Sequence, residues 1–336
     1  MSAFVRFLTF TAALLLVAAW VHSTARAEGP WEAQGHGLTV VEYVPADQPV
    51  TLKTCTQITF DNGYEVVTDL GNSRFLYRRG PGEAWKVSPV PVKMQHSLLY
   101  NPADQLFYAD DTANHRMIAF PDLRAPELAA ETTEMAGVRL DRPHDVVRDP
   151  QTGWLYMVNP NEPVVVRFRA LGVEEKALDL DDELNYSRGL TFTRGRLYVV
   201  GSSLGKIVEV TDFDQGHYEV HLGHGKKAEA PAGNWLRTGL VPNDLAWFDG
   251  WWYLTSYFTP VAPYSQPGED ADTNKFIRFR DWAAFREGRW EDISNLTPPG
   301  ATPYYLTVYD GALYLALFFD RGGRDAVLRL TPADGP

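Results

Sequence analysis

The sequence predicts an all-β fold, a six-bladed β-propeller of four-stranded antiparallel blades, because one strand pattern recurs along the whole chain. In each copy a short apolar strand ends in a tight turn, and a second strand with a Leu-Tyr or similar pair follows it. The copies begin at Cys55 or Thr56, His96, His144, Arg188, Asn243 and Tyr304. Repeats of roughly 40 to 60 residues that hold short strands are typical of small sheets arranged around a central axis.

The connections within each copy support this interpretation. The turns between the first two strands carry residues that favour tight turns, such as Asp249-Gly250 and Asp310-Gly311. The strands are rich in Tyr and Val, and no amphipathic stretch of helical length separates them, which argues against a parallel α/β sheet. We expect one helical turn, at Asp281 to Arg286.

The last copy lacks an outer strand of its own. Its third strand spans Ala326 to Leu330, and no fourth strand follows. The segment Leu38 to Val44 near the start of the chain is expected to pair with it, because an unpaired sheet edge invites aggregation. The prediction is therefore a ring closed by the N-terminal strand.

Residues 1–27 have the pattern of a secretory signal peptide. Met1 to Arg6 is short and basic, Phe7 to Val21 is apolar, and Ala25-Arg26-Ala27 fits a cleavage site. The apolar stretch is short for a membrane span, although an uncleaved anchor stays open as the alternative. We expect residues 28–336 to form the propeller of a periplasmic or secreted protein with no stable membrane span after cleavage.

Composition narrows the range of partners. Removal of residues 1–27 takes away Arg6 and Arg26 and no acidic residue, which changes the net charge from −12 to −14. A surface this acidic argues against nucleic acid and anionic membranes as partners. The single cysteine, Cys55, excludes an internal disulfide. We expect a monomer.

Two segments resemble the NHL repeat, in which Asn-His-Arg precedes the third strand of a blade. Asp110 to Phe120 contains Asn114-His115-Arg116, and Asp69 to Leu76 carries a weaker copy of the same pattern. The resemblance covers residues 28–336 as architecture and implies a six-bladed propeller.

Two strand starts resemble a second group of propellers. Pro143-His-Asp-Val and Pro242-Asn-Asp-Leu are similar to those of the gluconolactonase and senescence-marker-protein group and of strictosidine-synthase-like proteins. This resemblance is specific for the propeller and does not imply one particular activity.

The first residue of each inner strand is the best candidate position for chemistry, because it lies at one mouth of the central channel. His96, His144, Arg188 and Tyr304 occupy this position in four copies and are the candidate catalytic residues. An imidazole can act as a general base, and Arg188 can hold a carboxylate or an oxyanion. Tyr304 can donate a hydrogen bond or a proton.

Asn243 takes the same position in the fifth copy and is a candidate ligand-binding residue. His96 and His144 come from adjacent copies, and together with Asn243 they are the candidate metal ligands. The gluconolactonase-like resemblance implies a divalent cation held by carboxylates and Asn at such positions. Asn243 matches the Asn, whereas the ring has no carboxylate to match the others. The cofactor therefore stays unknown, and one divalent metal ion is the candidate.

Two long connections, Gly223 to Val241 and Thr259 to Lys275, are expected to rise around the same mouth. Loops of this length in a compact domain are usually functional or disordered, and a disordered surface insertion stays open as the alternative. Trp235, Tyr257 and Tyr264 are candidate ligand-binding residues that would give a small organic ligand an aromatic wall.

The closely spaced His217, His221 and His224 fall at an outer strand. We expect a solvated edge strand there, and a metal site is the alternative.

The leading functional hypothesis is a small-molecule site at the channel mouth, in a metal-assisted hydrolase of the lactonase or esterase kind or in a lyase. Whether the protein is an enzyme stays open, because channel-lining polar residues also bond only to one another and to trapped water. The alternative is a non-catalytic scaffold that holds another exported protein.

Overall fold

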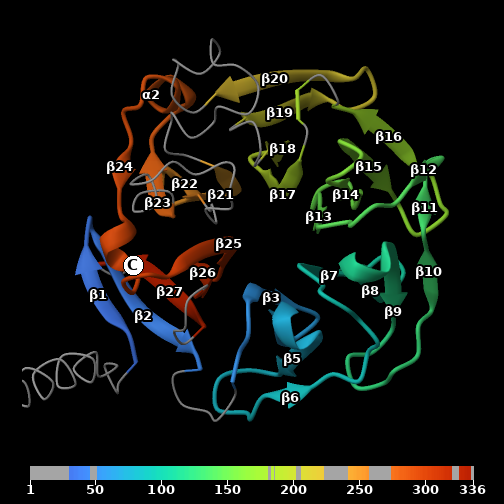
Figure 1. Cartoon of the computed structure of the whole chain (residues 1–336), viewed down its shortest axis with the longest axis horizontal. Helices are drawn as coiled ribbons and strands as arrows, with labels where there is room; N and C mark the ends of the chain where they lie inside the picture. The colour runs from blue at the N-terminus through green and yellow to red at the C-terminus, as the bar shows by residue number, and fades with distance from the viewer. Residues whose placement is uncertain are drawn as a thin grey trace, which may run out of the picture.

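Six sheets stand around a central channel in the computed structural model, as the blades of a propeller do (Figure 1). The structure describes residues 30–45, 51–180, 183–184, 186–201, 206–222, 241–256, 274–319 and 325–333. Neighbouring strands within each sheet are antiparallel. The predicted all-β six-bladed propeller is confirmed.

The first three blades take consecutive strands from the channel outward. Blade 1 consists of β3 (Cys55–Asp61), β4 (Tyr64–Asp69), β5 (Arg74–Arg78) and β6 (Lys86–Val87). Blade 2 consists of β7 (Leu98–Asn101), β8 (Leu106–Asp111), β9 (Arg116–Phe120) and β10 (Ala130–Thr132). Blade 3 consists of β13 (Asp145–Arg148), β14 (Leu155–Asn159), β15 (Val164–Phe168) and β16 (Lys176–Asp179). A hairpin of β11 (Glu134–Met135) and β12 (Val138–Arg139) precedes blade 3.

Blades 4 and 5 repeat this order. Blade 4 consists of β17 (Ser187–Thr193), β18 (Arg196–Gly201), β19 (Lys206–Asp212) and β20 (His217–Leu222). Blade 5 consists of β21 (Pro242–Phe248), β22 (Trp251–Ser256), β23 (Lys275–Phe279) and β24 (Glu291–Asp292).

The helices of the described residues are short. The predicted helical turn is α2 (Trp282–Arg286), and it begins after Asp281, whose side chain accepts a hydrogen bond from the Ala284 N–H at 2.8 Å. Three 3₁₀ helices are η1 (Leu70–Asn72), η2 (Thr112–Asn114) and η4 (Ser294–Leu296). No helix in the described ranges has the length and apolar character needed to cross a membrane.

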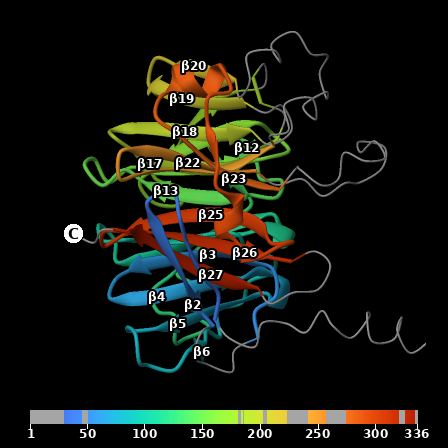
Figure 2. The same ribbon diagram turned by 90° about the vertical axis from the view of Figure 1, so that its left-hand side faces the viewer.

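The N-terminal strand closes the ring, as predicted. Blade 6 contains β25 (Thr302–Tyr309), β26 (Ala312–Phe318) and β27 (Ala326–Pro332), and β2 (Leu38–Val44) pairs with β27. Val40 lies opposite Leu330 in this pairing. Outside β2 the structure adds β1 (Glu32–Gly35), a fifth strand that the sequence analysis did not include. Figures 1 and 2 show β2 and β27 side by side.

Aromatic side chains fill the space between neighbouring blades. Between blades 4 and 5, the ring of Trp252 meets Tyr198 edge-on at 4.9 Å and lies 5.0 Å from Trp282. Full burial of one large apolar side chain stabilises a fold by about 1.5–3 kcal/mol relative to exposure. The core therefore consists of layers between sheets, which hold each blade to its neighbours.

The two NHL-like segments form the same clasp in blades 1 and 2. In blade 1, Asp69 accepts hydrogen bonds from Arg74 Nε at 2.7 Å, Asn72 Nδ2 at 2.8 Å and the Lys53 N–H at 2.7 Å. The equivalent contacts in blade 2 join Asp111 to Arg116, Asn114 and Lys93. Each clasp ties the segment before an inner strand to the end of the second strand, and so fixes where the inner strand begins.

Side chains of each inner strand also bind the backbone of the next inner strand around the channel. The contacts join Gln57 to Leu98, Ser97 to Val146, Asp145 to Leu190, Thr191 to Leu245, Asp244 to Leu306 and Thr307 to Ile58. They pass through all six blades and return to the first, so we name them the inter-blade ring. The ring satisfies backbone groups that face the channel and have no strand partner there.

We predict that removal of the closing strands disrupts the fold. A chain that begins at Pro45 lacks β1 and β2, which exposes the edge of β27 and the side chains that packed against Leu38, Val40 and Val44. It should aggregate or melt far below a control chain that begins at Pro30, as followed by size-exclusion chromatography and thermal denaturation. Equal melting temperatures for the two chains would contradict this account of ring closure.

Candidate functional site

One mouth of the channel holds a cavity of about 230 Å³ at the start of the inner strands. His96, His144, Arg188 and Tyr304 all line it, so the structure brings the four candidate catalytic residues together. Thr56 takes the place of blade 1, and its hydroxyl donates to the carbonyl oxygen of His96 at 2.9 Å. We name this space the histidine mouth.

The two imidazole rings lie against each other. The ring centroids of His96 and His144 are 3.7 Å apart and the planes differ by 26°. The Tyr304 hydroxyl lies 3.2 Å from His96 Nδ1. His144 Nδ1 lies 3.3 Å from the carbonyl oxygen of Arg142, which can only accept, so this nitrogen carries the proton. The neutral His144 ring therefore keeps an unprotonated Nε2 that can accept a proton.

Both imidazoles are buried, and their surroundings favour the neutral form. Burial lowers the pKa of His96 well below its usual range, and the His144 ring and the positive charge of Arg188 lower it further. Burial likewise lowers the pKa of His144, and the charge of Arg188 adds to the effect. At neutral pH the histidine mouth thus contains two proton acceptors beside a fixed cation.

Arg188 links the cavity to Asn243. The Arg188 guanidinium lies over the Tyr186 ring, 5.2 Å from its centroid, and Nη1 lies 3.5 Å from Asn243 Oδ1. Asn243 is fully buried, and its Nδ2 has no hydrogen-bond partner among the described residues. The amide therefore orients Arg188 from behind and does not line the cavity itself.

A buried carboxyl group holds the two histidine strands in place. Asp110 accepts from the His96 and Ser97 N–H groups at 2.8 and 2.7 Å, and Thr112 Oγ1 lies 2.6 Å from Asp110 Oδ2. The same hydroxyl lies 2.7 Å from the carbonyl oxygen of Pro143, the residue before His144. Burial raises the pKa of Asp110 to about 8. A protonated Asp110 can donate to Thr112, which leaves the threonine hydrogen for Pro143.

The donor set of the mouth does not fit a metal ion held by His96, His144 and Asn243. A metal lies in the plane of an imidazole that ligates it, and two rings stacked at 3.7 Å do not direct their lone pairs at one point. Ca²⁺ needs six or more oxygen ligands, and the side-chain oxygen of Asn243 lies against Arg188 in a residue that does not line the cavity.

Three candidate residues fall outside the described residues. Trp235, Tyr257 and Tyr264, and most of the two long connections that contain or adjoin them, lie in residues 223–240 and 257–273. The aromatic wall and the loops over the mouth therefore stay predictions.

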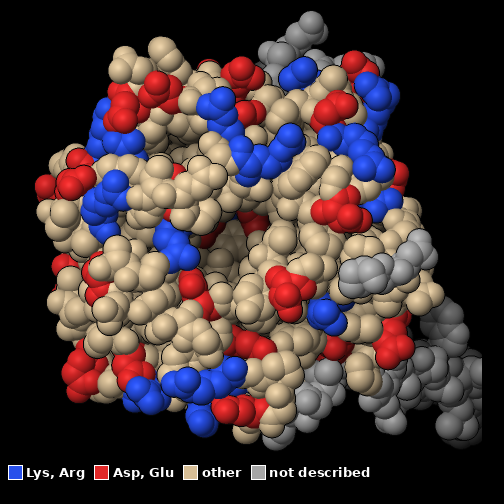
Figure 3. Space-filling model, turned by 180° about the vertical axis from the view of Figure 1, so that it is seen from behind, with Lys and Arg blue, Asp and Glu red and all other residues tan. Residues whose placement is uncertain are grey.

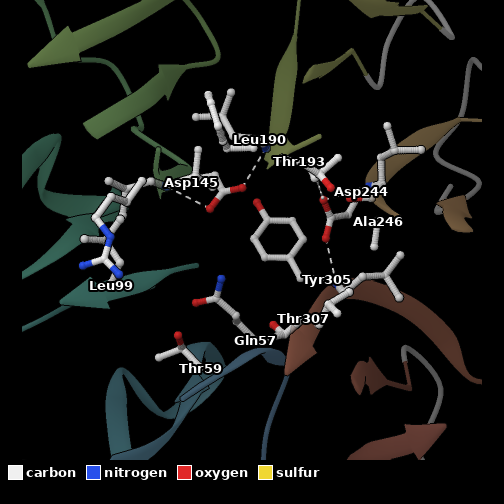
Figure 4. A pocket seen from close by; sticks show the side chains of 18 of the residues that line it. Gln57, Thr59, Leu99, Asp145, Leu190, Thr193, Asp244, Ala246, Tyr305 and Thr307 are labelled. Carbon is white, nitrogen blue, oxygen red and sulfur yellow. Dashed lines mark hydrogen bonds between the residues drawn. The ribbon is translucent and has the colours of Figure 1, made fainter. Parts of the chain in front are cut away.

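The opposite end of the channel opens into a second cavity, of about 380 Å³. Figure 3 views the molecule from this side and shows the central hollow with acidic residues in and around it. Figure 4 shows Tyr305 in the middle of this space, between Asp145 and Asp244. The Tyr305 hydroxyl donates to the carbonyl oxygen of Arg188 at 2.7 Å and lies 3.4 Å from that of His144. Tyr305 thus braces the backbone of the histidine mouth from below.

The sequence analysis gave no role to Asp145 and Asp244. Both are buried and accept backbone N–H bonds from the next blade, at 2.7 Å each. Burial raises the pKa of Asp145 to about 7, and burial together with the Asp145 charge raises that of Asp244 well above its usual range. The sequence contains a pattern that could have identified this role. A hydrogen-bonding side chain follows the first residue of four inner strands, namely Gln57, Ser97, Asp145 and Asp244.

Known structures share this fold at low sequence identity. Virginiamycin B lyase from Staphylococcus aureus is 11% identical, with a TM-score of 0.56 over 92% of this chain and 96% of the other. A gluconolactonase from Xanthomonas campestris is 15% identical, with a TM-score of 0.60 over 91% of this chain and 96% of the other. No protein-family model matches the sequence, and no curated protein is significantly similar to it. The resemblance to gluconolactonase-like six-bladed propellers is therefore confirmed at the level of the fold.

We predict that the two buried neutral histidines lower the stability of the fold in acid, an effect opposed by the buried carboxyl groups of Asp110, Asp145 and Asp244, whose raised pKa favours the folded state as the pH falls. In the unfolded chain a histidine has a pKa of about 6.5, whereas the buried rings of the folded protein stay neutral at lower pH. Protonation below about pH 6.5 therefore favours the unfolded chain, and the stability that these rings allow above that pH is lost as the pH falls. The loss approaches about 1.4 kcal/mol per pH unit for each histidine.

Urea denaturation between pH 7.5 and 5 measures this slope. His144→Gln should raise the stability at pH 5 relative to that at pH 7.5, because one destabilising histidine is gone, whereas Thr56→Ser, which changes the same cavity without a titratable group, should keep the wild-type slope. An unchanged slope in His144→Gln would show that burial of this imidazole does not cost the fold stability in acid.

Proposed function

We propose that this protein is an exported enzyme that binds a small carbonyl compound at the histidine mouth and acts on it as a hydrolase or lyase. The observation that carries the proposal is the stacked, buried pair of neutral imidazoles beside Arg188 and Tyr304 in one cavity. Neutral imidazole is the most frequent general base in proteins, and a nearby fixed cation is suited to a developing oxyanion.

His144 is the proposed base. The Arg142 carbonyl fixes its Nδ1–H, so Nε2 is the acceptor for a proton from water in hydrolysis, or from a carbon next to the carbonyl in elimination. Arg188 would bind the carbonyl or carboxylate oxygen of the substrate and stabilise the negative charge that forms there. Tyr304 would return a proton to the leaving group, with His96 as its hydrogen-bond partner.

Two further observations support the proposal. The similar folds include a lactonase and a lyase, and both are enzymes that act on small molecules. The basic, apolar and small-residue pattern of residues 1–27 supports export to the periplasm or the outside. The partner is then a small molecule, and the acidic surface disfavours nucleic acid.

We predict that the purified protein turns over a lactone, an aryl ester or virginiamycin B, and that His144→Gln lowers kcat by about 10²–10⁴-fold. Product formation is followed by liquid chromatography and mass, which separates hydrolysis from elimination. His115→Gln is the matched control, because His115 is an exposed histidine of blade 2 that pairs with Asp141.

Turnover that survives His144→Gln at the level of the control would remove His144 from the chemistry. Failure of the wild-type protein to bind or convert any of the three compounds would favour a non-catalytic scaffold.

A further inference from the structure

Three potential metal ligands meet at the outer rim of blade 4, far from the histidine mouth. Glu209 lies on β19 directly opposite Glu219 on β20, and His221 lies two residues after Glu219 on the same face of the strand. One donor atom from each of the three lies within 4.8 Å of the other two. Figure 1 shows β19 and β20 at the periphery of the ring, beside α2. We name these residues the rim cluster.

His221 is held in a defined position. Only 2% of its surface is exposed, and its ring stacks on Trp282 of α2 at 3.9 Å with an angle of 1° between the planes. Its Nε2 lies 3.0 Å from Glu209 Oε2. The expectation of a solvated edge strand therefore holds for the exposed His217 and is wrong for His221.

Among the described residues, His221 makes one polar side-chain contact, through Nε2. Its Nδ1 is buried and has no hydrogen-bond partner within the described part of the chain, so Glu209 is the polar group that His221 addresses. The imidazole nitrogen that faces Glu209 is Nε2, so this is the nitrogen that can ligate an ion in place of its contact with the carboxylate.

The carboxylates of Glu209 and Glu219 carry like charges on directly opposite residues of β19 and β20. Like charges directly opposite across an antiparallel pair destabilise the sheet. Arg196 Nε lies 3.8 Å from Glu209 Oε1 and offsets part of this repulsion. Glu219 is exposed, so the cluster is open to solvent on one side. A cation between the carboxylates would remove the repulsion.

We propose that the rim cluster binds one divalent transition-metal ion, such as Zn²⁺, through Glu209, Glu219 and His221. One imidazole nitrogen and two carboxylate oxygens suit this class of ion, whose bonds to such donors measure about 2.0–2.2 Å. Donors around one tetrahedral ion then lie roughly 3.3 Å apart, close to the 3.0 Å between His221 Nε2 and Glu209 Oε2. Water from the open side completes the coordination.

The bound ion would join β19 to β20 and, through the Trp282 stack, to α2. Binding to the folded chain alone stabilises it by mass action. The inference does not depend on the proposed function, because no residue of the rim cluster lines the histidine mouth.

The test is titration of the full chain, stripped with a chelator, with Zn²⁺ by calorimetry and with Co²⁺ by visible absorption. One equivalent should bind, with intense Co²⁺ bands of a four-coordinate ion and a rise in melting temperature. His221→Ala, Glu209→Gln and Glu219→Gln should each weaken binding by at least about 100-fold. Glu219 is exposed, so its variant reports on ligation without a risk to folding.

Two controls distinguish this site from other histidines. His217→Ala removes an exposed histidine of the same strand, and the double variant His96→Gln, His144→Gln removes the stacked pair of the mouth. Both should bind the ion as the wild type does. Absence of binding by the wild-type chain, or an equal loss in either control, would overturn the proposal.

Discussion

The inner strand of every blade has an edge that faces the channel, and the backbone groups on that edge have no neighbouring strand to bind. The inter-blade ring solves this problem with side chains. Asp145 accepts the Leu190 N–H, and Asp244 accepts the Leu306 N–H, each at 2.7 Å and from a buried position. A buried donor left without a partner costs about 1–3 kcal/mol, so an unfilled inner edge would cost the propeller much of its stability.

The same constraint explains where the candidate site lies. Side chains alternate along a strand, so the residue that reaches to the next blade is preceded by one that points to the channel mouth. Asp145 follows His144 in this way. Gly189 follows Arg188 at the equivalent position of blade 4. No side chain fits there, because a Cβ atom would lie 2.5 Å from the carbonyl oxygen of Asn243. Thr191, two residues further along, makes the inter-blade contact instead.

Tyr305 connects the inter-blade ring to the histidine mouth. It occupies the inter-blade position of blade 6, yet its hydroxyl crosses the channel to the Arg188 and His144 carbonyl groups. The histidine mouth is thus supported from below by the inter-blade ring and from the side by Asp110. Both supports contain buried carboxyl groups whose pKa burial raises, so the geometry of the mouth is coupled to groups that lie outside it.

The repeated strand pattern allowed the fold to be predicted from the sequence. The blade count, the closing strand Leu38–Val44 and the ring of first residues follow from the strand pattern, because each copy carries the same turn and strand signals. The stacking of His96 on His144 did not follow, since register gives neighbours but not ring orientation. The role of Asp110 and the burial of His221 were missed for a related reason. Asp110 reaches the strand of His144 through Thr112, which contacts Pro143, and His221 stacks on Trp282. No local pattern encodes these contacts between elements distant in sequence.

We conclude that side chains, and not channel packing alone, protect the inner edges. Amide hydrogen exchange at Leu306 and Leu190 in the Asp244→Ala variant measures this protection. Leu306 should exchange at least about 10-fold faster, after correction for the change in global stability, while Leu190, still bound by Asp145, should keep its wild-type protection. Wild-type protection of both amides in the variant would contradict this conclusion and assign the stability of the inner edges to packing.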